Sequence, residues 1–369
     1  MDKRIVIPRL VVRPVLPPPL EIGARIRPQW LQWQVGRYRE KLSFGLGGKG
    51  KADIWVPERE GEQHNLILTQ FYDSLIPQHG FVGPSQFAAV GTGSTAPDPS
   101  QTQLANEIGT SSNPRRTNLV PAGESNEIEA LATPGEYNIR RVFEFTEAQV
   151  GGLNLTEWGF SPVSSWNGPL MTRELFRDGA GNPVVLTLAS DQRLRLIYRY
   201  RITLSPTTAQ AVIVNIGGNG PGNRTAQFIL TGILGISSNY AGIDFVHGQT
   251  RGDLFICENL ARGTYGIPVG RVFATPNAAP LTYLHSVFSV GGSTPFMSLS
   301  FNPASGRSRS ASVLLGTSDW VTTIRSVVLA GAVTQDIPTV NLVFDSGQQF
   351  AKDNWHKLLI AYWQITWGP

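Results

Sequence analysis

Alternation of apolar and polar residues marks residues 194–204, LRLIYRYRITL, as a β-strand with one packed face. Leucine, tyrosine and isoleucine occupy every second position, and arginines fill most of the positions between them. This period of two residues is typical of a half-buried strand. Residues 358–367, LLIAYWQITW, repeat its length, its aromatic content and its ending. We predict that each segment forms the closing strand of a domain, and that residues 184–188 pair with the first.

Shorter segments upstream of these two strands also correspond in order. LILT at 66–69 corresponds to FILT at 228–231, and the Thr-Glu-Trp that ends at Trp158 corresponds to the Ser-Asp-Trp that ends at Trp320. The spacing between partners stays nearly constant along the chain, as in an internal repeat. We therefore predict a tandem duplication in which Trp158 superposes on Trp320. The alternative is that two unrelated β-domains share similar strands and turns.

Glycine and proline are frequent along the chain. Of its 369 residues, 39 are glycine and 26 are proline, a composition that favours strands bounded by turns over long helices. One short helix is expected near residues 66–75. We predict an all-β protein with two tandem antiparallel β-sandwich-like domains. The predicted parts are an extended, proline-rich basic arm at 1–30, a β-hairpin segment at 31–60 attached to the first domain, a first β domain at 61–205, a glycine-rich linker at 206–222 and a second β domain at 223–369.

The predicted arm combines apolar pairs with prolines and basic residues. Proline favours extended backbone and is excluded from central strand positions. The apolar residues expected to dock on another subunit are Ile5, Val6, Leu10, Val11 and Val12. Two interpretations stay open: an extended arm that binds a neighbouring subunit, and a strand-like segment packed on its own domain.

The charge of the chain comes mainly from arginine. The net charge is +4 at pH 7 and the pI is about 9.3. Beyond the N-terminus the arginines are dispersed rather than interleaved with aromatic residues, so we expect no nucleic-acid binding. The single cysteine, Cys257, excludes an intramolecular disulfide. Prolines interrupt the first residues, so no signal peptide is expected, and no apolar run is long enough for membrane insertion.

Sequence motifs for catalysis or metal binding are missing. Gly45, Gly50 and Lys51 have the spacing of a phosphate-binding loop, but Ala52 replaces the hydroxyl residue that would hold Mg²⁺, so a hairpin tip is the better interpretation. The five histidines are isolated, and neither Gly-x-Ser-x-Gly nor His-Glu-x-x-His occurs. We predict that the protein is not an enzyme and has no cofactor and no metal. A glycosidase carboxylate pair is defined in space, so the sequence leaves that alternative open.

One tryptophan is a candidate for carbohydrate binding. Tryptophans in predicted strands, such as Trp158 and Trp367, are expected in the core or in an interface. Trp166 instead lies in a loop between Ser165 and Asn167, where an indole ring can stack on a sugar. We therefore name Trp166 as the candidate glycan contact.

An ordered series of segments in the first unit carries a family resemblance. The series is GTGSTAP at 91–97, LANEI at 104–108, VFEF at 142–145, LTEWG at 155–159, and residues 170–178 and 184–200. Together these segments, which lie within residues 64–204, resemble a recurrent domain of tailed-bacteriophage structural proteins found in tail fibres, tail tips and other virion appendages. The second unit lacks the first two segments, so the resemblance reaches it only through the predicted duplication.

The resemblance implies a virion structural protein with no catalytic residue. Its expected partners are other virion proteins, reached through the N-terminal arm, further copies of the same chain, and a host surface glycan. Its expected location is the virion, after synthesis in the host cytoplasm. Two alternatives remain: a capsid decoration or head-fibre protein, and a tailspike-type carbohydrate-active enzyme.

Overall fold

The computed structural model confirms the all-β class. It describes residues 20–45, 48–75, 83–133, 135–218, 220–230, 270–275, 298–301, 306–315, 322–331, 337–353 and 358–369. The strands in the first half of the chain are β1 (Leu20–Gly45), β2 (Gly48–Gln63), β3 (Leu66–Ile67), β4 (Phe87–Gly91), β5 (Gly109–Thr110), β6 (Asn113–Pro114), β7 (Glu127–Ala130), β8 (Glu136–Phe145), β9 (Asn154–Leu155), β10 (Glu157–Ser161), β11 (Thr172–Leu175), β12 (Leu186–Thr187) and β13 (Arg193–Ser205). The later strands are β14 (Gln210–Gly218), β15 (Gly222–Leu230), β16 (Gly270–Thr275), β17 (Ser298–Phe301), β18 (Ser308–Leu315), β19 (Thr322–Ile324), β20 (Ser326–Gly331), β21 (Ile337–Phe344), β22 (Phe350–Lys352) and β23 (Leu358–Gly368).

The helical content of the described residues is small. The helical segments are η1 (Phe71–Leu75), η2 (Gly83–Ser85) and α2 (Glu147–Val150). The helix predicted near residues 66–75 is thus shorter than expected, because Leu66–Ile67 forms strand β3.

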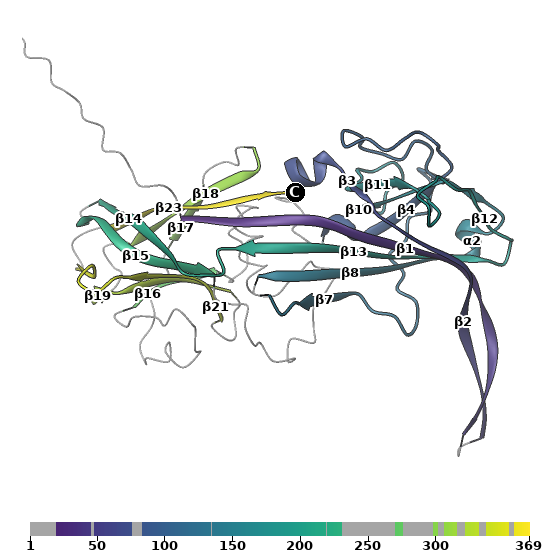
Figure 1. The fold of residues 1–369 in the computed structure, drawn as a ribbon, viewed down its shortest axis with the longest axis horizontal. Coiled ribbons are helices and arrows are strands. Elements are labelled where there is room, and N and C mark those ends of the chain that lie inside the picture. Colours follow the sequence, from purple (N-terminus) through teal and green to yellow (C-terminus); the bar gives the residue numbers. More distant parts are fainter. Residues whose placement is uncertain are drawn as a thin grey trace, which may run out of the picture.

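A 13-stranded sheet runs through both halves of the chain (Figure 1). Its path is β16-β20-β21-β15-β14-β23-β1-β13-β8-β7, with β2, β17 and β18 paired beside it. Strand β1 lies at its centre, antiparallel to β13 and parallel to β23. The two segments with the strongest alternation in the sequence are therefore strands, as predicted, and β1 joins them.

The position of β1 corrects part of the predicted arm. Residues 20–30 belong to β1, and Leu20, Ile22, Ala24 and Ile26 are buried in the main sheet. These apolar residues alternate with polar ones, which is the strand period that the nearby prolines obscured. Pro28 is accommodated because the pairing register with β13 shifts between Pro28 and Trp30, so the backbone N–H that proline lacks is not required there. The residues expected to dock on another subunit, Ile5, Val6, Leu10, Val11 and Val12, lie outside the described residues.

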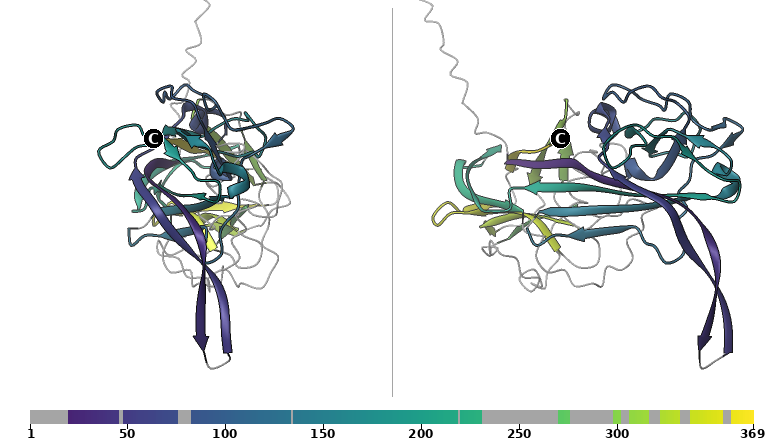
Figure 2. Two further views of the ribbon diagram at one scale, coloured as in Figure 1. Left: turned by 90° about the vertical axis from the view of Figure 1, so that its right-hand side faces the viewer. Right: turned by 45° about the vertical axis from the view of Figure 1, so that its right-hand side comes forward.

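A four-stranded sheet, β3-β11-β10-β4, packs over one end of the main sheet (Figures 1 and 2). Phe160 of this small sheet stacks on Phe143 of β8, with ring centroids 5.0 Å apart, and on Tyr198 of β13, with centroids 4.5 Å apart. Trp158 is fully buried beside Phe160. The two layers thus share one aromatic core, which matches the predicted sandwich-like packing of the first domain.

The described strand pairings do not confirm the tandem duplication. In the first unit β3 pairs with β11, whereas β15, at the corresponding place in the second unit, pairs with β14 and β21. Trp320 lies outside the described residues, so its superposition on Trp158 stays a prediction.

Two further segments differ from the predicted organisation. Residues 210–218, which include the strand-like residues 211–216 within the predicted linker, form strand β14, with Val214 and Ile216 buried. Strand β12 pairs with β9 and not with β13, whose neighbours are β1 and β8. In both cases the local strand pattern was visible, but the partner is set by contacts far along the chain.

Candidate functional site

The outer parts of β1 and β2 form a β-hairpin that extends beyond the main sheet. Pairing between β1 and β13 ends at Gly36 and Arg193, while pairing between β1 and β2 continues to Gly45 and Gly48. Within the described chain, residues 37–45 of β1 therefore pair with β2 alone. At about 3.3 Å per residue they extend roughly 30 Å. Figures 1 and 2 show this hairpin projecting away from the body of the molecule.

Gly36 marks the place where the hairpin leaves the sheet. The register of the β1–β2 pairing shifts between Val35 and Gly36, which is the geometry of a β-bulge. A β-carbon at Gly36 would lie 2.9 Å from the Pro57 α-carbon and would also meet the Val56 carbonyl oxygen. Glycine is required here because the two strands approach too closely for a side chain.

A cluster of charged side chains fixes the root of the hairpin. The Glu58 carboxylate accepts hydrogen bonds from Gln192 Nε2 at 2.6 Å and from Arg39 Nη2 at 3.0 Å, and it lies 2.8 Å from Arg37 Nε. Arg37 also pairs with Asp191. The Gln192 hydrogen bond, followed by the arginines, lowers the pKa of Glu58 from 4.5 to about 2. Glu58 is therefore ionised at neutral pH and ties β2 to the turn before β13.

A second layer at the root joins aromatic and charged side chains. Arg195 Nε lies 2.7 Å from Glu144 Oε2, and the Arg195 guanidinium lies 4.0 Å from the centre of the Trp55 ring. The Tyr38 hydroxyl accepts a hydrogen bond from Arg195 Nη2 at 2.6 Å and donates one to Glu144 Oε2 at 3.1 Å. Burial raises the pKa of Tyr38, so it stays a neutral donor. Because a ring stacked on a guanidinium has few alternative positions, this layer sets the direction of the hairpin.

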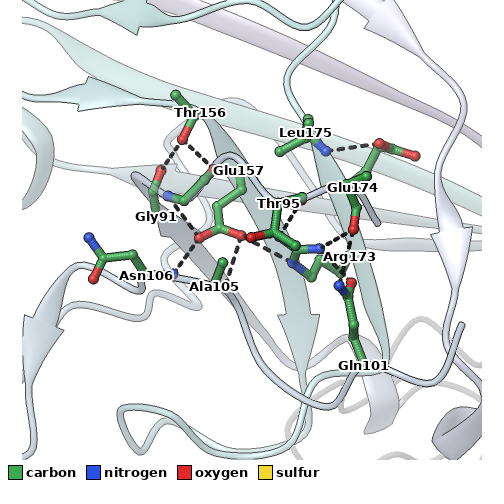
Figure 3. A network of polar contacts seen from close by, with 12 residues as sticks. Gly91, Thr95, Gln101, Ala105, Asn106, Thr156, Glu157, Arg173, Glu174 and Leu175 are labelled. Carbon is green, nitrogen blue, oxygen red and sulfur yellow. Dashed lines mark hydrogen bonds and ion pairs between the residues drawn. The ribbon is translucent and has the colours of Figure 1, made fainter. Parts of the chain in front are cut away.

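A buried acid-base pair lies elsewhere, inside the small sheet (Figure 3). Glu157 and Arg173 are both fully buried, with Glu157 Oε2 2.7 Å from Arg173 Nη2 and 3.0 Å from its Nε. The backbone amides of Gly93, Ala105 and Asn106 also donate to the Glu157 carboxylate, at 2.7–3.0 Å. Both carboxylate oxygens are thus bound by protein donors. The pair fastens the loop between β4 and β5 onto the small sheet.

A second buried pair accounts for the position of Trp166. Arg116 binds both carboxylate oxygens of Glu107 at 2.8 Å. The Trp166 indole N–H donates to the Glu107 carbonyl oxygen at 3.3 Å, and the Asn167 backbone N–H donates to Glu107 Oε2 at 3.1 Å. Trp166 is half-buried, and its indole N–H, the polar group of the ring, forms its hydrogen bond within the protein. Its role as a glycan contact stays a prediction.

Sequence reasoning located the tip of the hairpin but missed its root. The glycine-rich tip pairs Gly45 with Gly48, as predicted, and Gly50 and Lys51 lie on β2. The root residues Arg37, Glu58 and Arg195 come from distant parts of the chain, and no local spacing connects them. A usable signal was the charged run Glu58-Arg59-Glu60 that follows Trp55 on β2.

Over the described residues, no group of three potential metal ligands comes together. None of the helices in that part of the chain is long and apolar enough to cross a membrane. The candidate functional element is the projecting hairpin, held at its root by contacts of Glu58 and Arg195. We compared the chain with protein-family models, curated protein sequences and solved structures, and none of them matches it.

Proposed function

We propose that this chain is a structural protein of a tailed-phage virion, and that its projecting hairpin binds a neighbouring subunit during assembly. One observation carries the proposal: beyond Gly36 the hairpin has two strand edges that pair with no other strand of the described chain. Unpaired edges present backbone donors and acceptors that another chain can bind by strand addition. A fixed root favours such binding because the hairpin loses little freedom when it docks.

The charged groups of the first domain also support a structural role. Glu107, Glu144 and Glu157 are buried carboxylates, and each is bound to at least one arginine. Buried ions need such partners because removal from water is costly. We assign these carboxylates to holding loops and strands together. This assignment favours the structural reading over a tailspike-type enzyme, which needs two carboxylates that face a bound sugar.

Shortening the hairpin tests the proposal. Residues 41–52 are replaced by Asn-Gly, which joins Glu40 to Asp53 at a position where they already pair across the hairpin. The shortened protein should fold and fail to enter virus particles, as measured by mass spectrometry of purified particles. A matched control is Val185→Ser, which changes an exposed apolar side chain elsewhere and should not affect incorporation. Normal incorporation of the shortened protein would refute the assembly role of the hairpin.

A second experiment gives the position of the protein on the particle. Labelled full-length protein located by electron microscopy on the tail supports a tail-fibre or tail-tip component. Label on the head supports a capsid decoration or head-fibre protein. Release of sugars from host polysaccharide by the purified protein would instead support the enzyme alternative.

A further inference from the structure

A cavity of about 380 Å³ lies beside the small hairpin formed by β5 and β6. Its lining comes from the loop between β4 and β5, from the β5–β6 hairpin itself and from Leu153, and every lining residue belongs to the described chain. The volume is within the range of about 300–1,000 Å³ that is usual for small-molecule sites. Neither the hairpin of β1 and β2 nor Trp166 contributes to the lining, so this cavity is separate from the features described above.

The wall that carries Asn106 and Glu107 is fixed by two buried carboxylates. The Asn106 backbone N–H donates to Glu157 at 2.7 Å, and its carbonyl oxygen accepts from the Thr92 backbone N–H at 2.9 Å. Figure 3 shows the Asn106 side chain pointing away from Glu157. The Glu107 side chain is only 1% exposed and is paired with Arg116, so Glu107 brings no free charge to the cavity. A wall that is fixed in advance loses little freedom when a ligand binds.

Arg115 supplies a positive charge to the cavity. Its Nη1 donates to the carbonyl oxygen of Gln149 at 2.8 Å, and in the described part of the chain its guanidinium forms no ion pair. The side chain is half-buried, and its Nε and Nη2 groups are open to solvent. Together they form an edge with two parallel N–H donors, which matches the two oxygens of a carboxylate. One arginine balances one negative charge, whereas a phosphate monoester carries about 1.5–2 at pH 7, so a carboxylate fits better.

Neutral polar and apolar groups complete the lining. The exposed side-chain amide of Asn113 forms no hydrogen bond within the described chain. The Asn106 amide nitrogen donates to the Thr92 hydroxyl at 2.6 Å, which leaves the Asn106 side-chain oxygen as an acceptor. Ile108 and Leu153 are half-buried and pack against the main core. Amide groups beside an apolar surface suit a sugar, which has hydroxyl groups around its ring and C–H groups on its faces.

We propose that this cavity binds a sugar that carries a carboxylate, as in an acidic unit of a surface glycan. The sugar carboxylate pairs with Arg115, and hydroxyl groups of the ring bind the side-chain amides of Asn106 and Asn113. This binding role goes beyond the assembly role proposed above and does not depend on the projecting hairpin.

A panel of small ligands tests the proposal on the full-length protein. Saturation-transfer NMR at millimolar ligand should show binding of at least one of D-glucuronate, D-galacturonate and N-acetylneuraminate. For glucuronate and galacturonate the matched control is the uncharged amide of the same sugar, which should bind at least about tenfold more weakly because it lacks the charge-assisted hydrogen bonds. Acetate and inorganic phosphate are the controls for an anion without a sugar ring, and both should bind at least about tenfold more weakly than the acidic sugar.

Substitutions locate the binding in this cavity. Arg115→Met should abolish binding of the acidic sugar, and Arg115→Lys should weaken it at least about tenfold, because lysine has no pair of parallel N–H donors. Asn113→Ala should weaken binding several-fold with an unchanged thermal midpoint. The matched control is Arg224→Met, because Arg224 also donates its Nη1 to a backbone carbonyl oxygen, at 3.0 Å, and does not line the cavity.

Three results would overturn the proposal: no binding of any of the three acidic sugars, equal binding of acetate or phosphate, or unchanged binding by Arg115→Met. If Arg115→Met fails to fold, unchanged binding by Asn113→Ala or equal binding of the uncharged sugar amide would overturn it instead. The protein with the shortened hairpin retains the cavity and should bind the acidic sugar as the wild type does. Failure of the assembly role would therefore leave sugar binding intact, and failure of sugar binding would leave the assembly role intact.

Discussion

Glutamate–arginine pairs occur both in the small sheet and at the root of the hairpin, but the first pair is buried and the second is partly exposed to solvent. In the small sheet, the side chains of Glu157 and Arg173 are both 0% exposed. At the root, Arg37 is 31% exposed and Glu58 is 24% exposed. Loss of one partner in the buried pair leaves an ion without water, whereas at the root water can replace the lost partner. The buried pair therefore maintains the fold, and the exposed pair orients an element that leaves the fold.

The largest effect is expected when the buried pair is broken. Arg173→Met leaves the Glu157 carboxylate buried without its cation and should lower the free energy of unfolding by about 3–5 kcal/mol. Urea unfolding followed by tryptophan fluorescence measures the loss. The double variant Glu157→Leu/Arg173→Met removes both charges and should be more stable than Arg173→Met alone. Equal stability of wild type and Arg173→Met would show that the pair does not hold the small sheet.

A smaller effect is expected from a change beside the same pair. A β-carbon at Gly93 would lie 2.5 Å from the Ala105 β-carbon and would also meet Glu157 Oε1. Gly93→Ala should therefore overpack the site and cost about 1–3 kcal/mol in urea unfolding. Gly179→Ala is the matched control, because nothing lies within 4 Å of the added carbon. If both variants lose the same stability, the close packing around Glu157 is not the cause.

At the root of the hairpin the expected effect is small and depends on pH. The pKa of Glu58 is about 2 in the folded protein, against an ordinary value of 4.5. Its stabilising contribution is therefore complete above about pH 4.5 and disappears as the pH falls to about 2. Glu58→Gln should melt slightly below the wild type at pH 7, and the two melting temperatures should converge near pH 2. A difference that persists at pH 2 would contradict this role of the carboxylate.

The smallest effect on stability is expected from shortening the hairpin itself. Replacement of residues 41–52 by Asn-Gly leaves Arg37, Glu58 and the second root layer in place and removes backbone that contacts only the other hairpin strand in the described structure. Its thermal midpoint should equal that of the full-length protein. A lower midpoint would mean that the outer hairpin packs on the body and is not free for a partner.

Local patterns predicted several elements of the fold correctly. Residues 194–204 and 358–367, which show the two-residue period, lie in β13 and β23, and the glycines near Gly45 lie at the hairpin tip. Such features follow from backbone geometry over a few residues, so the residues themselves specify them. For residues 20–30 the sequence left two interpretations open, an extended arm and a strand-like segment packed on its own domain, and the structure shows a strand paired in the main sheet.

The candidate site was much less accessible to sequence reasoning. The root cluster joins Arg37, Glu58, Gln192 and Arg195, residues that the chain brings together only when β1, β2 and β13 pair. The partner of Trp166 was hidden for the same reason, since Glu107 lies in another loop. A charged residue in the sequence gives no sign of whether it will be buried with a partner or exposed in water.

The sequence by itself determined that this protein is rich in strands and turns, where its strongest strands lie and where its hairpin turns. The tertiary structure decided that β1 lies between β13 and β23, that Glu157 meets Arg173 in the core, and that the hairpin extends beyond the sheet. The physical reason is that a strand's period depends on its own backbone, whereas its partner depends on contacts distant in sequence. Those contacts must together offset the entropy of ordering the chain between them.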